Sequence, residues 1–253
     1  MKIQRFTVGS ISTNCYLVSC EDTLESVIID SDYRELLELE AILHAVDREG
    51  LNVKYLVNTH GHSDHVGGNR LLMDATGARL LMHESCAELT TKPVSVVKEL
   101  AASGVLGVCP ICGGTKFNVD HSLDESEGVI TCGKCNSPLL PFRASPPPDI
   151  LLQDGDEITF GGVVLNVIHT PGHSPGGICL YSQRDGVLFS GDTIFKGSIG
   201  RTDLPRADHG DILRSVERLT AIPDDTRIYP GHGEATNMDD ERAYLESMIH
   251  ERE

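Results

Sequence analysis

The chain has 253 residues with 21 basic and 38 acidic side chains, which gives a formal net charge of −17 at pH 7. A protein of this charge repels a nucleic-acid backbone, so we expect no nucleic-acid partner. A hydrophobic content of 40% is typical of a globular protein with a sizeable core. The sequence contains no apolar run of about 18 residues and no secretory signal, which predicts a cytoplasmic protein without a membrane partner.

The first half of the chain predicts strands alternating with helices. We expect a strand hairpin at residues 15–19 and 26–30, a helix at 33–48, a strand at 53–57 and a helix around 71–72. In the first helix, apolar residues recur at intervals of three and four, which places them on one face: Leu36, Leu39, Leu43 and Val46. Gly50 follows where this helix is expected to end.

A second series of elements follows residue 150. We expect strands at residues 157–160, 163–168, 178–181, 187–189 and 227–229, and helices at 212–219 and 239–249. Residues 93–148 separate the two halves and end in three consecutive prolines, Pro146 to Pro148. Such a run forms a stiff extended connection, which suits the exit from an inserted module.

A cluster of histidine and aspartate directly follows the strand at 53–57. His60, His62, Asp64 and His65 lie within six residues, which is improbable by chance at this composition. Imidazole and carboxylate ligands together suit zinc, iron or manganese better than calcium or magnesium.

Three later turns supply further ligands of the same kinds. Each turn follows a predicted strand and contains glycine, which lets the backbone bend beside a crowded metal. The ligands that these turns supply are His173, Asp192 and His232. Four ligands are seldom enough for two metal sites, whereas the seven ligands of this chain are enough for both.

The ordered set of seven resembles the signature of the metallo-β-lactamase superfamily. The segments Thr13-Asn14-Cys15-Tyr16, Thr170-Pro171-Gly172-His173 and Ser190-Gly191-Asp192 are similar to its glyoxalase II-like branch, that of hydroxyacylglutathione hydrolases. The resemblance covers nearly all of the chain outside residues 93–148. It implies a mixed α/β (α+β) fold, an αββα sandwich with the metals at one edge.

The resemblance also implies how the ligands are divided. His60, His62 and His173 would hold one metal; Asp64, His65 and His232 would hold the other, and Asp192 would bridge both. Two cations that share a water lower its pKa toward neutrality. Asp64 would then orient the nucleophile and accept its proton. These features imply a hydrolase with two catalytic metal ions, zinc first and iron or manganese as alternatives, acting on a small-molecule thioester.

Two features leave alternatives open. Only 21 residues follow His232, so we expect most of the glutathione-binding contacts that glyoxalase II enzymes make through a helical C-terminal domain to be missing. The run Gly200-Arg201-Thr202-Asp203 also occurs in persulfide dioxygenases, oxidoreductases of the same fold that hold one iron, here through His60, His173 and Asp192. Lys196 and Arg201 are candidate substrate-binding cations, although either is equally interpreted as a solvated or ion-paired charge.

The separating segment carries its own metal motif. Cys109 and Cys112 form one C-x₂-C pair and Cys132 and Cys135 a second, 19 residues apart. This spacing predicts a tetrahedral structural zinc site. We therefore expect a single domain, 1–253, interrupted by a zinc-ribbon-like insertion at 105–141. The ribbon is predicted either to border the active site as a lid or to mediate protein contact or homo-oligomerisation. The other cysteines are expected to be buried: Cys15, Cys20, Cys86 and Cys179.

Overall fold

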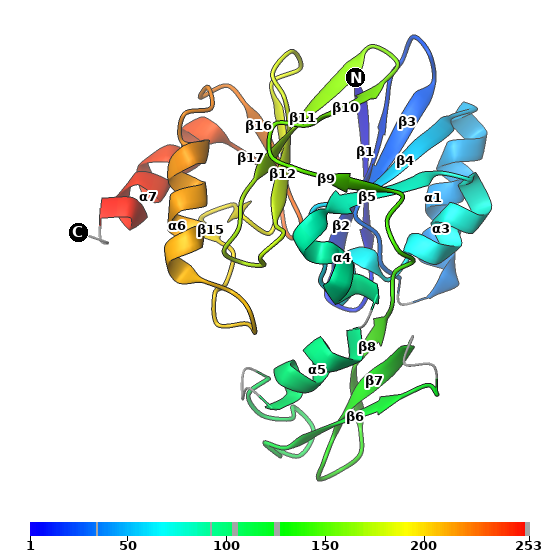
Figure 1. The fold of residues 1–253 in the computed structure, drawn as a ribbon, viewed down its shortest axis with the longest axis vertical. Helices are drawn as coiled ribbons and strands as arrows, with labels where there is room; N and C mark the ends of the chain where they lie inside the picture. Colours follow the sequence, from blue (N-terminus) through cyan, green and yellow to red (C-terminus); the bar gives the residue numbers. More distant parts are fainter. Residues whose placement is uncertain (34, 92, 103–105, 124–126, 251–253) are drawn as a thin grey trace.

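The computed structural model describes residues 1–250 except 34, 92, 103–105 and 124–126. Two six-stranded sheets pack face to face, with helices covering both outer faces (Figure 1). The predicted αββα sandwich is thus confirmed. None of the helices in the described part of the chain has the length and apolarity needed to span a bilayer.

The first sheet is built from the N-terminal half and one later strand. In spatial order its strands are β1 (Lys2–Val8), β2 (Thr13–Ser19), β3 (Glu25–Ile29), β4 (Asn52–Asn58), β5 (Arg79–His83) and β9 (Ile150–Leu152). The hairpin of β2 and β3 is confirmed. β9 pairs in parallel with β5, so the chain completes the first sheet after the insertion and only then enters the second.

The second sheet comes from the C-terminal half. Its order is β10 (Glu157–Phe160), β11 (Val163–His169), β12 (Ile178–Ser182), β13 (Val187–Gly191), β16 (Arg227–Pro230) and β17 (Thr236–Asn237). A small hairpin of β14 (Ile194–Phe195) and β15 (Ser198–Ile199) follows β13. The five strands predicted in this half all appear within one or two residues of their expected ends.

Helices cover the two outer faces of the sandwich. They are α1 (Leu36–Glu49), α2 (Ser63–Val66), α3 (Asn69–Thr76), α4 (Glu84–Thr91), α6 (His209–Leu219) and α7 (Met238–His250). α1 buries Leu39, Ile42 and Val46 against the first sheet and ends at Gly50 as predicted. The expectation that Leu36 shares this face is wrong: it lies at the first residue of the helix and is 58% exposed.

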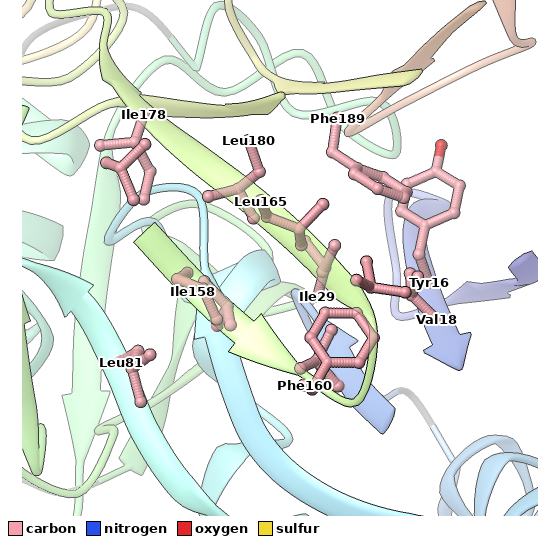
Figure 2. Packing of buried hydrophobic residues seen from close by; sticks show 14 of the residues in the cluster. Tyr16, Val18, Ile29, Leu81, Ile158, Phe160, Leu165, Ile178, Leu180 and Phe189 are labelled. Atoms are coloured by element: carbon pink, nitrogen blue, oxygen red, sulfur yellow. The ribbon is translucent and has the colours of Figure 1, made fainter. Parts of the chain in front are cut away.

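The main core fills the space between the sheets. Tyr16, Val18 and Ile29 from the first sheet face Phe160, Leu165 and Phe189 from the second (Figure 2). The Tyr16 hydroxyl donates to the Pro230 carbonyl oxygen at 2.6 Å, which ties β2 to the end of β16. This packing fixes the two sheets relative to each other at the edge where the candidate ligands lie.

The insertion forms a separate small sheet of β6 (Phe117–His121), β7 (Glu127–Cys132) and β8 (Pro138–Arg143), drawn below the sandwich in Figure 1. Helix α5 (Pro93–Ala102) packs on it through Val97, which joins Ile130 and Phe142 in a core of their own. The packed unit therefore includes α5 in addition to the predicted range 105–141, whose first residue, Val105, lies outside the described residues.

Candidate metal centre

The topology brings all seven predicted ligands to one edge of the sandwich. His60 and His62 follow β4, and Asp64 and His65 lie on the short helix α2. Asp192 and His232 follow β13 and β16, which are parallel neighbours whose last residues, Gly191 and Pro230, are paired. His173 lies in the turn between β11 and β12. Residues 172 positions apart in the sequence thus meet because their strands end at the same edge.

Three histidines form the first cluster. Nδ1 of His62 lies 3.0 Å from Nε2 of His60 and 2.9 Å from Nε2 of His173. Ligand atoms of a tetrahedral zinc site with bonds of about 2.0–2.1 Å lie about 3.3 Å apart. The three nitrogens converge closely enough to share one ion of this size.

The second cluster contains Asp64, His65 and His232. Oδ2 of Asp64 is 3.2 Å from Nε2 of both histidines, and the two Nε2 atoms are 3.3 Å apart. Asp192 lies between the clusters: its Oδ2 is 3.4 Å from Nε2 of His173 and its Oδ1 is 3.5 Å from Nε2 of His65. One carboxylate therefore reaches both groups.

The environment of these residues fits bound cations. Oδ1 of Asp192 is buried and accepts no hydrogen bond from the described residues, although burying an unpaired carboxylate oxygen is costly. A cation between the clusters would satisfy it.

The charges of the histidines agree with this interpretation. Burial lowers the pKa of His62 to about 3 and that of His173 to about 4, so both present neutral lone pairs. Burial also opposes protonation of His65, but the carboxylates of Asp64, Asp30 and Asp192 together raise its pKa well above its usual value. The second cluster is thus a site of negative potential, which attracts metal ions.

Asp30 is a supporting residue that the sequence analysis missed. Its carboxylate lies 2.8 Å from Nδ1 of His65 and accepts hydrogen bonds from the Thr59 backbone N–H at 2.8 Å and hydroxyl at 2.7 Å. A proton held on Nδ1 leaves Nε2 of His65 free to bind metal. A partial signal was present, since Asp30 is the last residue of the strand predicted at 26–30 and directly follows the observed strand β3.

Backbone groups orient the remaining ligands. Nδ1 of His173 lies 3.0 Å from the Arg201 carbonyl oxygen, which directs Nε2 toward the cluster. Asn14 donates to the carbonyl oxygens of Pro230 and Gly233, both at 2.9 Å, and thereby clamps the turn that carries His232. A Cβ on Gly231 would lie 2.2 Å from Oδ1 of Asp192, so only glycine leaves room for the bridging carboxylate.

The two candidate substrate-binding cations are both engaged by carboxylates. Nζ of Lys196 is 2.6 Å from Glu234, and Arg201 forms two bonds of 2.6 Å to Asp203. Both basic side chains are more than half exposed. Arg201 lines the cavity in front of the metal centre, whereas Lys196 is absent from the described lining.

The four ribbon cysteines converge in the insertion. Sγ of Cys109 lies 3.8 Å from that of Cys135, and Sγ of Cys112 lies 3.5 Å from that of Cys132. Thiolates bound to zinc at about 2.3 Å are about 3.8 Å apart. All four sulfur atoms lie within 4.8 Å of one another, so they are able to hold one ion. The remaining cysteines are buried as expected: Cys15, Cys20, Cys86 and Cys179.

Comparison with known proteins agrees with the fold and shows the family. The family model described as "Metallo-beta-lactamase superfamily" matches residues 8–232. An uncharacterised protein of Aquifex aeolicus is 34% identical, with 96% of this chain and 95% of the relative covered. A hydroxyacylglutathione hydrolase of Haemophilus influenzae is 26% identical, with 96% and 95% covered. The crystal structure of the BLEG-1 B3 metallo-beta-lactamase has a TM-score of 0.73 at 29% identity, with 96% of this chain and 97% of that chain covered.

Proposed function

This chain belongs to the metallo-beta-lactamase superfamily, and on that premise we propose that it is a metal-dependent thioester hydrolase. The observation that carries the proposal is the pair of clusters joined by Asp192, together with the similarity to a hydroxyacylglutathione hydrolase. His60, His62 and His173 hold one ion, Asp64, His65 and His232 hold the second, and Asp192 contacts both. The four ribbon cysteines hold a structural zinc.

Two bound metal ions would supply Lewis acidity, which acidifies water and polarises a carbonyl group. The chain's own residues then position the reaction. Asp64 lines the cavity next to His62, and its Oδ2 is held by the Thr13 hydroxyl at 3.2 Å. This fixed carboxylate accepts the proton that the attacking water loses.

Thioester hydrolysis makes few further demands on the protein. A C–O bond forms between water and the carbonyl carbon, the C–S bond breaks with its electron pair on sulfur, and the proton returns to the thiolate. Because a thiol has a pKa of about 8.5, its thiolate leaves without a strong general acid. The constellation of carboxylates and imidazoles is therefore sufficient.

The test is hydrolysis of S-D-lactoylglutathione by the metal-loaded protein, followed by release of free thiol. Chelation should abolish turnover, and added zinc, iron or manganese should restore it. Asp64→Asn should lower kcat/KM by at least about 100-fold with an unchanged circular dichroism spectrum. Asp74→Asn, an exposed aspartate on α3, is the matched control and should leave kcat/KM unchanged. Full turnover by Asp64→Asn would refute the assigned role.

A further inference from the structure

A cavity of about 790 Å³ lies in front of the metal centre. Its floor includes His62, Asp64 and His232, so a group bound in the cavity is adjacent to the proposed reacting atoms. The volume is within the range of about 300–1,000 Å³ that is typical of small-molecule sites.

The cavity lies between the sandwich and the inserted module. Ile11, Phe195 and Leu204 line it from the sandwich, and Val108, Phe117 and Leu139 line it from the module. Ile11 is 50% exposed and Val108 is 61% exposed, so apolar surface is left open to a ligand on both walls. Exposed apolar surface beside a polar centre indicates a binding site for an apolar group.

The basic side chains of the described lining already have partners. Arg201 is paired with Asp203, and the guanidinium of Arg143 lies 3.9 Å from the centre of the Tyr33 ring. Arg143 also donates to the Tyr33 carbonyl oxygen at 3.1 Å and is 3.8 Å from Asp32. With the net charge of −17, this arrangement favours a neutral chain over an anionic one.

Contacts at its exit fix the module beside the metal centre. Arg143 is the last residue of β8, and its contacts with Asp32 and Tyr33 join the module to the loop after β3. Next along the chain, the Ser145 backbone N–H donates to the Thr90 carbonyl oxygen at 2.9 Å. Asn69 on α3 donates to the Ser145 hydroxyl at 2.8 Å. The module wall is therefore held in a defined position beside the ligand clusters.

We propose that the cavity receives the acyl chain of an apolar, medium-chain acyl thioester, and that the zinc module forms one wall of the acyl site. This inference rests on the proposed function and deepens it. The carriers on which cells build thioesters are polar thiols, so the apolar part of such a substrate is its acyl group. Its carbonyl lies at the metal centre, and its chain extends between Ile11 and Val108.

The first test measures binding without catalysis. S-alkyl thioethers of N-acetylcysteamine, from ethyl to octyl, resist hydrolysis and are titrated into the metal-loaded protein by calorimetry. The association constant should rise about threefold for each added methylene, and octyl binding should show a negative heat-capacity change. An association constant independent of chain length would overturn the proposal.

Matched variants test whether the inserted module forms one wall of the acyl site. Val108→Asp should weaken octyl binding at least tenfold, whereas Ile111→Asp should leave it unchanged. Ile111 is equally apolar and 68% exposed in the same cysteine loop, but it does not line the cavity. Ile11→Asp tests the opposite wall without altering the module and should also weaken octyl binding at least tenfold. Equal octyl binding by Val108→Asp, Ile11→Asp and the wild type would overturn the proposal.

The second test separates this inference from the proposed function. Acyl thioesters of N-acetylcysteamine, from acetyl to octanoyl, are assayed for thiol release, and kcat/KM should increase at least tenfold along the series. Hydrolysis without chain-length dependence would support the thioesterase and overturn the acyl site. Chain-length-dependent binding without any hydrolysis would support the acyl site and refute the thioesterase.

Discussion

Gly172 lies directly before His173 with a φ of +135°, pressed against the first turn of α6. A Cβ at this position would lie 2.2 Å from the Ile212 nitrogen and 2.4 Å from its Cα, and a backbone cannot give way as a flexible side chain does. The turn that presents His173 is therefore specified by the absence of a side chain.

We expect Gly172→Ala to lower the free energy of unfolding about 2 kcal/mol more than Gly186→Ala does. Gly186 has a φ of +62° with nothing within 4 Å of its Cβ position, so its substitution isolates the backbone strain of about 1–2 kcal/mol. Urea unfolding of the two variants measures the difference. Equal urea midpoints for the two variants would show that α6 moves away from the added methyl group without loss of stability.

Asp30 should control the affinity of the second cluster for metal. Because its carboxylate holds Nδ1 of His65, Asp30→Ala should weaken metal binding there by about 10- to 100-fold. Thr59→Val removes the hydroxyl that donates to Asp30, which also lies 3.2 Å from Nδ1 of His60, and should have a smaller effect on the second cluster. Competition with a chelating dye measures both affinities. Unaltered binding by Asp30→Ala would assign the residue to folding alone.

The candidate ligands could be predicted from the sequence because each follows a strand and the chemistry of the side chains is distinctive. The role of Asp30 could not, because it depends on the strand end of β3 lying beside that of β4. The same reason explains Asn14, whose amide reaches carbonyl groups more than 200 residues away. Contacts that depend on the order of strands in a sheet cannot be predicted from the local sequence pattern.

Among the elements, β8 and the segment after it hold the inserted module in place. Arg143→Met keeps the apolar stem but loses the contact with the Tyr33 ring and the bond to its carbonyl oxygen. Amide exchange in residues 138–149 should then become about tenfold faster, equivalent to about 1.4 kcal/mol of local stability. Hydrogen-exchange mass spectrometry measures this rate.

The control for Arg143→Met is Arg70→Met, which removes an exposed guanidinium from α3 and should leave the exchange rate unchanged. Arg143→Lys keeps the charge but not the planar group, and should give an intermediate rate. Equal exchange in all three variants would mean that the backbone contacts of Ser145 hold the segment alone.

Two strands that the sequence did not predict, β1 and β9, share one property: their stability comes from the strands beside them. β1 has the mixed sequence Lys2–Val8, with four of its seven residues polar, and is held by the full-length pairing with β2. β9 has only three residues and exists as a strand because β5 offers a parallel partner. Tertiary pairing here decides what local propensity leaves open.

At the level of the whole molecule, the sandwich was predictable because the ordered ligands identify a family with a known fold. The position of the module was not. Its cysteine spacing predicts a metal site but does not decide between a position beside the active site and a role in protein contact. That placement creates the cavity, because Val108 and Phe117 line it only in the assembled chain.

The complete protein should contain three metal ions per chain, two in the joined clusters and one in the module. Elemental analysis of protein purified without added metal measures this number. Replacing Cys109 and Cys132 together by serine should remove one ion and leave two, since at least 41 positions separate these cysteines from the sandwich ligands in sequence and the module has a core of its own.

Asp192→Ala provides the converse measurement. Because the Asp192 carboxylate reaches both clusters, the loss of this side chain should reduce the number of metal ions per chain toward the single zinc of the module, while α5 and β6–β8 stay folded.

Loss of all metal in the variant that lacks Cys109 and Cys132 would contradict independent sites. One zinc with one iron in the wild type would instead favour the mononuclear persulfide dioxygenase, and oxygen consumption with glutathione persulfide would then be the activity to measure.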